Sequence, residues 1–522
     1  MGVVNMIEEV SIGDLRASLD RGEFTVRELV QACLDRIASM DHEGPALHAV
    51  IETNAEALAI ADELDRELHD GRSRGLLHGI PVLFKDNIAT ADGMQNTAGS
   101  LALEGALPRK DAFISGRLRE AGAVILGKAN LSEWANIRCS RSSSGWSGRG
   151  GQARNPYQLD RTPSGSSSGS AVAVAASYAP VAIGTETNGS ICSPAGTCGL
   201  VGIKPTVGLI SRSGVIPISS LQDTTGPMTR NVADAAMVLN ALAADDSDDP
   251  AQRGDGNPLF PQRGERHPVD YTAVLDPDGL RNARIGVWRQ PLSHSPAAQA
   301  VFERALETMR DAGAILIDPV ELPAMNENAR GNRLVDLLLW RLGPDIAAYL
   351  NDYTDPGFPV RNLADIVAFN REHKDCEMPW FGQDILELGL DDNLLEESVY
   401  EALATKMQRL AREDGIDAVL REHELDAIVA PANSPATPID LVNGDHHVGG
   451  SSTPSAVAGY PIVTVPAGLY AGLPVGLNFL GGAFSEASLI RLAYSYEQAS
   501  QARRPPTYAA AGVFPPSPAT VA

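Results

Sequence analysis

Short apolar segments alternate with segments of helical pattern along most of this chain, and this alternation restricts its fold more than any other feature. Apolar runs of strand length lie at 80–84, 123–126 and 181–183. Helical patterns at 112–121 and 171–176 separate them. A chain in which helices alternate with short buried strands builds a sheet with helices packed against it. The sequence therefore predicts an α/β fold.

The alternation continues into the C-terminal half. Further strands are predicted at 284–288, 314–317, 425–430, 462–465 and 475–480, with helices at 297–311 and 486–498. Residues 11–41 predict two helices, the second beginning with a capping box of Thr25 and Glu28. Two stretches differ from the pattern. Residues 244–268 are polar and rich in Pro and Gly, which predicts a surface excursion, and residues 330–415 are mainly helical and are expected to cap a substrate cleft.

The charge balance narrows the classes of possible partner. The chain has 42 Lys and Arg residues against 66 Asp and Glu residues, a formal net charge of −24. Such a chain repels phosphate backbones and anionic membrane surfaces. Its apolar stretches all fall well short of the ~20 residues that cross a bilayer. We therefore expect no nucleic-acid partner and no membrane association.

Cysteine and histidine usage argues against metal and disulfide chemistry. The five cysteines are irregularly spaced without a Cys-x-x-Cys pair, and the ten histidines form no H-E-x-x-H motif. The His446-His447 pair is expected to be exposed rather than metal-bound, and there is no phosphate loop or Rossmann fingerprint. We expect no metal and no cofactor. Reduced cysteines and a start without signal-peptide features favour a cytoplasmic protein, although a removed export signal would leave the same sequence.

Three short segments contain the residues best suited to chemistry. They are 79–87 (Gly-Ile-Pro-Val-Leu-Phe-Lys-Asp-Asn), 165–170 (Gly-Ser-Ser-Ser-Gly-Ser) and 184–190 (Gly-Thr-Glu-Thr-Asn-Gly-Ser). The first places Lys85 at the end of an apolar strand, and the others place serines in glycine-flanked loops. A lysine that can lose its proton, relayed through one serine to another, creates a nucleophile without histidine. Such a nucleophile attacks acyl groups, and amides are the expected target.

Lys85 is a candidate base only if its amine can be neutral. An ordinary pKa near 10.4 leaves only ~0.04% of the amine neutral at pH 7. Burial that lowered the pKa to ~8 would raise this to ~10%, at a cost of ~3 kcal/mol. The alternative is an ordinary strand-end lysine that pairs with a carboxylate such as Asp86.

The two serine segments each have an ordinary alternative. Residues 165–170 resemble a flexible linker, or a G-x-S-x-G elbow centred on Ser167, but they lead directly into the apolar stretch 171–176 and follow a poor strand. Residues 184–190 could be a simple tight turn. In the functional interpretation, Ser190 attacks, and the backbone N–H groups of Thr187, Asn188, Gly189 and Ser190 form a nest that stabilises the oxyanion.

In this order, the three segments resemble the amidase signature family of serine hydrolases. The similarity extends from about residue 10 to 505 through further motifs at 131–136, 199–206, 223–228, 458–461 and 472–476. Residues 145–152 and the Gly-Ser-Ser-Ser-Gly-Ser form are most similar to the bacterial peptide amidases of that family. The resemblance implies a single large domain over 1–505, with a mixed central β-sheet covered by helices on both faces. Its signature core is expected at about 75–235, its substrate-shaping helices at 330–415 and a loose tail at 506–522.

The resemblance also implies a Ser-Ser-Lys triad. Lys85 matches the family's base, Ser166 its relay serine, held with a cis peptide, and Ser190 its acylated nucleophile. Ser167 and Ser168 are expected to support the relay. The chain departs from the commonest family pattern at Asn188, where glycine or aspartate is usual, and also at Ser164, Ser168 and Cys192. These departures keep all three triad members but bear on substrate choice.

The sequence therefore predicts an amide hydrolase that forms an acyl-enzyme and releases ammonia from C-terminal peptide amides. Its expected partner is a small-molecule or short peptide amide, and its oligomeric state is left open. Three alternatives remain. They are an aryl or aliphatic acylamidase or acyl-transfer enzyme with the same triad, a glutamine amidotransferase subunit that supplies ammonia to a partner, and a non-catalytic binding protein on the same scaffold.

Overall fold

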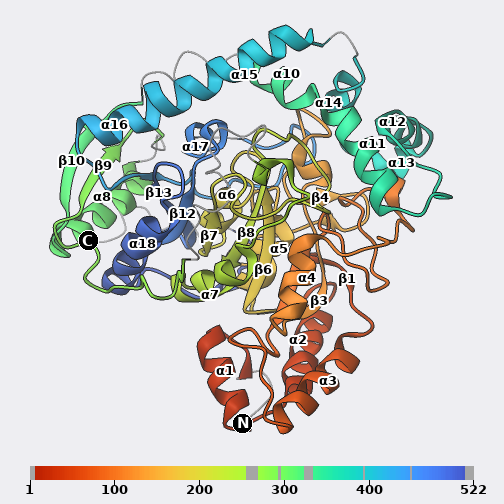
Figure 1. Cartoon of the computed structure of the whole chain (residues 1–522), viewed down its shortest axis with the longest axis horizontal. Helices are drawn as coiled ribbons and strands as arrows, with labels where there is room; N and C mark the ends of the chain where they lie inside the picture. The colour runs from red at the N-terminus through yellow and green to blue at the C-terminus, as the bar shows by residue number, and fades with distance from the viewer. Residues whose placement is uncertain are drawn as a thin grey trace.

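Eleven strands of the described chain form one mixed sheet at the centre of the protein (Figure 1). Their order is β1-β3-β2-β6-β8-β7-β12-β13-β11-β9-β10. The computed structural model describes residues 6–253, 269–291, 296–322, 333–391, 394–446 and 449–511. The sheet strands are β1 (Val50–Thr53), β2 (Pro81–Lys85), β3 (Val124–Ala129), β6 (Val181–Glu186), β7 (Val201–Lys204), β8 (Thr224–Thr229), β9 (Arg284–Trp288), β10 (Ile315–Val320), β11 (Ala427–Pro431), β12 (Ile462–Tyr470) and β13 (Leu473–Leu480). A separate hairpin joins β4 (Trp146–Ser147) to β5 (Gly151–Gln152).

Parallel and antiparallel pairs form separate blocks across the sheet. The pairs β2–β3, β2–β6, β9–β10 and β9–β11 are parallel. The pairs between them, from β6–β8 through β7–β12 to β11–β13, are antiparallel, as is the edge pair β1–β3. The strands of the N-terminal half thus form one side of the sheet and those of the C-terminal half the other. Strand β7 joins the two halves by pairing with β12.

Helices cover both faces of this sheet. The described helices of four or more residues are α1 (Ile12–Asp20), α2 (Val26–Met40), α3 (Ala57–His69), α4 (Phe113–Glu120), α5 (Ser168–Ala175), α6 (Cys192–Thr197), α7 (Val232–Leu242), α8 (Pro296–Asp311), α10 (Arg333–Leu339), α11 (Leu342–Tyr353), α12 (Leu363–Glu372), α13 (Lys374–Glu377), α14 (Asp384–Leu388), α15 (Glu397–Ala411), α16 (Asp417–Glu422), α17 (Thr453–Ala458) and α18 (Glu486–Ser500), with short 3₁₀ and π turns between some of them. The parallel crossovers β2–α4–β3 and β3–α5–β6 run in opposite directions along the sheet. Because such crossovers are right-handed, α4 and α5 lie on opposite faces. The α/β prediction with a mixed, two-sided sheet is therefore confirmed.

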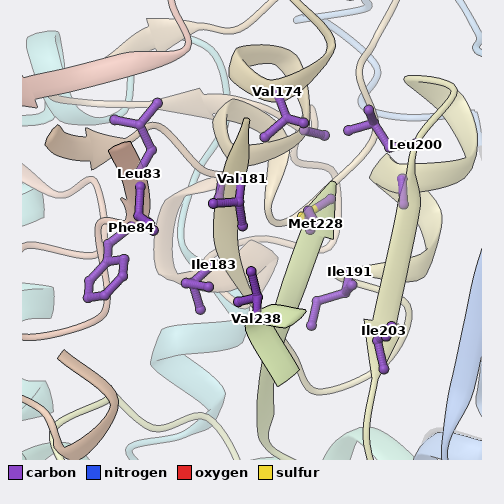
Figure 2. Close-up of a cluster of buried hydrophobic side chains, with 14 of the residues drawn as sticks. Leu83, Phe84, Val174, Val181, Ile183, Ile191, Leu200, Ile203, Met228 and Val238 are labelled. Atoms are coloured by element: carbon purple, nitrogen blue, oxygen red, sulfur yellow. The ribbon is translucent and has the colours of Figure 1, made fainter. Parts of the chain in front are cut away.

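The central strands β6 and β8 are buried on both sides because helices cover both sides. Every residue of β6 is buried. Val181 and Ile183 of β6 lie in one apolar cluster with Met228 of β8 and Val174 of α5 (Figure 2). Helix α5 is itself buried along its whole length, which only its small residues allow. This packing fixes the ends of β2 and β6, where the candidate residues lie.

The N-terminal helices form as their sequence predicts. The Thr25 side chain accepts a hydrogen bond from the N–H of Glu28, and the Glu28 carboxylate accepts one from the N–H of Thr25. The predicted capping box is therefore confirmed. Helices α1, α2 and α3 lie together at one end of the molecule, and the long α15 runs along the opposite side (Figure 1).

The polar stretch at 244–268 is only partly described. Half of the residues in its described part are exposed (Asp245, Ser247, Asp248, Pro250 and Arg253), as a surface excursion requires, but two of its carboxylates are not. Asp246 and Asp249 are buried. The Ser211 hydroxyl donates to Asp246, and the Arg212 guanidinium pairs with Asp249 at 2.9 Å. Buried carboxylates of this kind require such partners, and the partners come from a distant loop. Residues 254–268 lie outside the described residues.

The two remaining predicted regions are each described in part. Between 333 and 415 the described chain is mainly helical, from α10 to α15. Of the predicted tail, residues 506–511 are described, and there the N–H of Tyr508 donates to the carbonyl of Pro156 at 2.9 Å. None of the helices in the described ranges is both long enough and apolar enough to cross a membrane.

Candidate active site

A cavity of about 480 Å³ opens where the three candidate segments meet. Ser166, Ser190 and the loop 187–189 lie in its wall. The other described lining residues come from 135–137, 144, 164–165, 192–193, 338, 432–433, 449–450 and 452–453. All of these described lining residues are uncharged, so the cavity suits a neutral group.

Lys85 lies directly behind Ser166 and is fully buried. Its Nζ is 2.7 Å from Ser166 Oγ, 2.8 Å from Thr185 Oγ1 and 3.3 Å from the carbonyl oxygen of Thr185. A neutral amine has two N–H donors and one lone pair. The two oxygens of Thr185 can accept both N–H groups, which leaves the lone pair to accept the hydroxyl proton of Ser166. In the charged form, the same amine donates to Ser166 instead.

Burial gives this lysine an unusual acidity. Removal from water lowers the pKa of Lys85 from 10.5 to about 7, against the opposing effect of the Glu186 and Asp223 carboxylates. About half of the amine is then neutral at pH 7, more than the sequence alone suggested. The alternative pairing with Asp86 is wrong, because that carboxylate faces away. It accepts hydrogen bonds from Thr97 and Gly99 and lies 3.7 Å from Arg149.

The serine segment is a rigid, buried turn rather than a linker. The Gly165–Ser166 peptide bond is cis, as the family resemblance implied. Ser167 Oγ donates to the carbonyl of Thr185 at 3.0 Å, and the N–H of Ser167 donates to the carbonyl of Ser190 at 3.1 Å. Ser168 Oγ donates to the carbonyl of Ser164 at 2.6 Å. Neither Ser167 nor Ser168 lines the cavity, so their side chains hold the turn together. The elbow interpretation fails, since no strand leads directly into this turn: the preceding described strand, β5, ends at Gln152.

The loop after β6 holds Ser190 at the cavity. Ser190 is 8% exposed, and Gly189 has a φ of +82°, which favours glycine. The Glu186 carboxylate accepts hydrogen bonds from the N–H groups of Ile191 at 2.7 Å and Cys192 at 3.0 Å. Thr187 Oγ1 donates to Asp223 at 2.6 Å. The loop 187–190 is therefore fixed on both sides of Ser190.

Several polar residues at the site were not predicted from the sequence. Only Thr185 could have been found from the sequence, because it lies within the candidate segment 184–190 and carries a hydroxyl. Asn433 Nδ2 donates to Ser193 Oγ at 3.1 Å, and Ser193 Oγ lies 2.8 Å from Ser164 Oγ. Such residues follow no motif, and only the sheet order brings them close. Those that the sequence did not indicate are Asn433, Ser193, Ser452 and Thr453.

These residues are suited to acyl chemistry without a metal ligand set. Among the described residues, no group of three or more His, Cys, Asp or Glu side chains could hold a metal ion. The site combines a neutralisable amine, a hydroxyl in contact with it and a second serine in a backbone-rich loop. Such a set can activate a serine hydroxyl and stabilise an oxyanion.

This chain is similar to known amidases. The family model described as Amidase matches residues 28–490. A probable amidase of Arabidopsis thaliana is 40% identical over 510 residues, covering 97% of this chain and 92% of that protein. The X-ray structure of native peptide amidase from Stenotrophomonas maltophilia is 50% identical, with a TM-score of 0.90 and coverage of 96% of this chain and 99% of that one. A peptide amidase in complex with the competitive inhibitor chymostatin is 51% identical, with a TM-score of 0.90 and the same coverage of the two chains.

Proposed function

The chain belongs to the amidase family, whose members hydrolyse amides, and we propose that it does so with a triad of Ser190, Ser166 and Lys85. The observation that carries this proposal is the buried contact of 2.7 Å between Lys85 Nζ and Ser166 Oγ. The lowered pKa of Lys85, about 7, adds to it, because a half-neutral amine can act as a base at neutral pH.

The first step forms an acyl-enzyme. Lys85 Nζ takes the hydroxyl proton of Ser166, and Ser166 Oγ takes the proton of Ser190. Ser190 Oγ then bonds to the amide carbon, whose oxygen becomes negative. The backbone N–H groups of Thr187, Asn188, Gly189 and Ser190 stabilise that oxyanion.

The second half of the reaction returns the protons. The proton held on Lys85 passes back through Ser166 to the nitrogen of the leaving amine, so the carbon–nitrogen bond breaks and ammonia departs. Water then attacks the ester carbon, giving its proton along the same route, and the acid product leaves with the Ser190 hydroxyl restored.

We assign C-terminal peptide amides as the substrate class. Two findings support this choice. The uncharged lining suits a neutral carboxamide, and its described residues offer no cation to the carboxylate product. The two similar peptide amidase structures, one of them with the competitive inhibitor chymostatin, provide the second.

The proposed domain layout is one domain over 1–505 with its signature core at about 75–235. We assign substrate shaping to the helices of 330–415. Leu338 of α10 lies in the cavity wall, which supports that assignment.

The test measures ammonia release from peptide amides by purified Ser190→Ala and Lys85→Met variants. We expect turnover to fall by about 10⁴-fold or more, because each variant removes a member of one catalytic unit. Ser73→Ala and Lys110→Met, at exposed positions, are the matched controls and should match the parent. Turnover that persists in Ser190→Ala would contradict the triad.

The same assay separates the alternative activities. Peptide amides should be hydrolysed faster than anilides, simple aliphatic amides or free glutamine. A fluorophosphonate probe should label the parent at Ser190 and leave Ser190→Ala unlabelled. A faster reaction with anilides would assign an acylamidase, and an unlabelled parent would assign a non-catalytic protein.

A further inference from the structure

The side chain of Asn188, within the proposed oxyanion loop, is fixed by two hydroxyls from the far end of the chain. Ser452 Oγ donates to Asn188 Oδ1 at 2.8 Å. Asn188 Nδ2 donates to Thr453 Oγ1 at 3.2 Å. The side-chain amide of Asn188 thus uses both its acceptor and a donor. Its two partners lie 264 and 265 positions further along the chain.

The residue before these two hydroxyls, Ser451, belongs to a buried network of hydrogen bonds. Ser451, beside them, donates from Oγ to the carbonyl of Pro431 at 2.7 Å and accepts from Asn478 Nδ2 at 3.0 Å. Asn478 Oδ1 in turn accepts from Thr464 Oγ1 at 2.7 Å. These residues belong to β11, β12 and β13 or lie beside them, and Ser451, Thr464 and Asn478 are fully buried. The network ties the 451–453 turn to the C-terminal side of the sheet.

The 451–453 turn also packs closely against the loop 187–190. A Cβ placed at Gly189 would lie 2.9 Å from Ser452 Oγ, so the turn contacts the backbone of the loop itself. Asn188 is suited to this contact because it is neutral and can both donate and accept. An aspartate at this position could accept from Ser452 but could not donate to Thr453, and a glycine could do neither.

We propose that Ser452 and Thr453 are positioning residues that act through Asn188 to hold the oxyanion loop in its productive shape. The inference rests on the proposed function. The loop carries the attacking serine and the N–H groups that meet the oxyanion, so a small displacement weakens the transition state more than substrate binding. The C-terminal half of the sheet therefore sets the geometry of a reaction whose three reactive side chains all lie in the N-terminal half.

The experiment measures kcat and KM for a peptide amide in a set of variants. Ser452→Ala combined with Thr453→Val should lower kcat by about tenfold to a hundredfold, with KM changed by less than about threefold. Thr453→Ser, which keeps the hydroxyl, should recover most of the loss that Thr453→Val causes alone. When Ser452→Ala and Thr453→Val are added to Asn188→Ala, kcat should fall by less than about twofold below that of Asn188→Ala alone, because all three residues act as one unit.

Two outcomes would overturn the inference. The first is a double variant whose kcat stays within about twofold of the parent. The second is a triple variant whose loss of kcat equals the product of the losses in the double variant and in Asn188→Ala, because independent sites combine in this way. Thermal unfolding of each variant shows whether the fold survives, and the Thr453→Val and Thr453→Ser pair carries the test if the double variant does not. The two proposals fail differently. If only the positioning role is wrong, Ser190→Ala is still inactive, whereas an active Ser190→Ala rejects the triad itself.

Discussion

A single lysine illustrates what residue patterns can and cannot predict. The apolar run before Lys85 correctly indicated a buried strand end, and burial is what lowers its pKa. The sequence could not show that Thr185 supplies both acceptors for the amine, because that contact spans 100 positions. Nor could it exclude Asp86 as the partner, since the groups that hold the Asp86 carboxylate come from Thr97, Gly99 and Arg149.

The lowered pKa of Lys85 predicts the pH dependence of the reaction. The neutral amine is the proposed base, so kcat/KM for an uncharged peptide amide should rise with pH and level off above a midpoint near 7. Stopped assays of ammonia release between about pH 5 and about pH 9 measure this profile. Lys110→Met should leave the midpoint in place. A profile that stays flat across this range would show that no group with such a pKa controls the reaction.

At the scale of elements, composition predicted the apolar strands well and the polar ones poorly. Strand β8 has the sequence Thr-Thr-Gly-Pro-Met-Thr, which is more typical of a turn. It is a strand because it pairs with β6 on one side and β7 on the other. Gly226 is needed there, since a Cβ would collide with the carbonyl oxygen of Ile203. Such pairing is a long-range property that local patterns do not contain.

Helix α2 provides a prediction at this scale. Its capping box satisfies two N–H groups, and the Asp65 carboxylate accepts from Val26 at 2.7 Å and Arg27 at 3.0 Å. Thr25→Ala should therefore destabilise the first turn by about 1 kcal/mol, while Thr25→Ser should be close to neutral. Hydrogen exchange at the amides of that turn measures the change. Equal exchange rates in the two variants would mean that Asp65 alone maintains the helix start.

The whole molecule brings together segments that no local pattern relates. The motifs between 79 and 190 indicated the reactive residues, and their order along the chain identified the family. The cavity wall also includes 432–433, 449–450, 452–453 and Leu338. These positions follow no motif, because their approach depends on β12 pairing with β7 across the middle of the sheet.

A second long-range junction attaches the helical region to the sheet. Arg138 pairs with Glu133 at 2.9 Å, and its guanidinium lies over the neighbouring rings of Trp146 and Phe381. Glu377 is buried near the same group, with its carboxyl accepting from Ser100 at 2.7 Å. Burial, together with the neighbouring Glu377, raises the pKa of Glu133 to about 8. The junction therefore binds protons more tightly in the folded protein than in the unfolded chain.

This junction predicts how stability varies with pH. A carboxyl whose folded pKa exceeds its unfolded value of 4.5 contributes stability at low pH that is lost as pH rises through about 8. Glu377→Gln removes one of the causes that raise the pKa of Glu133. The loss in the free energy of unfolding between low pH and pH 8 should therefore be smaller in this variant by roughly 1 kcal/mol. Melting curves of variant and parent between about pH 5 and about pH 8 measure it, with exposed Glu372→Gln as control. Parallel curves for Glu377→Gln and the parent would contradict the assignment.

The bridge from Asn188 to the 452–453 turn also bears on when the protein becomes active during its synthesis. The turn that contacts the loop is synthesised 264 residues after Asn188, and by then Lys85, Ser166 and Ser190 have all been made. On the proposed function, a nascent or truncated chain holds every reactive group and yet hydrolyses little. On this view, full activity requires the turn and the two strands beside it, β12 and β13, which follow the reactive residues by more than 260 positions.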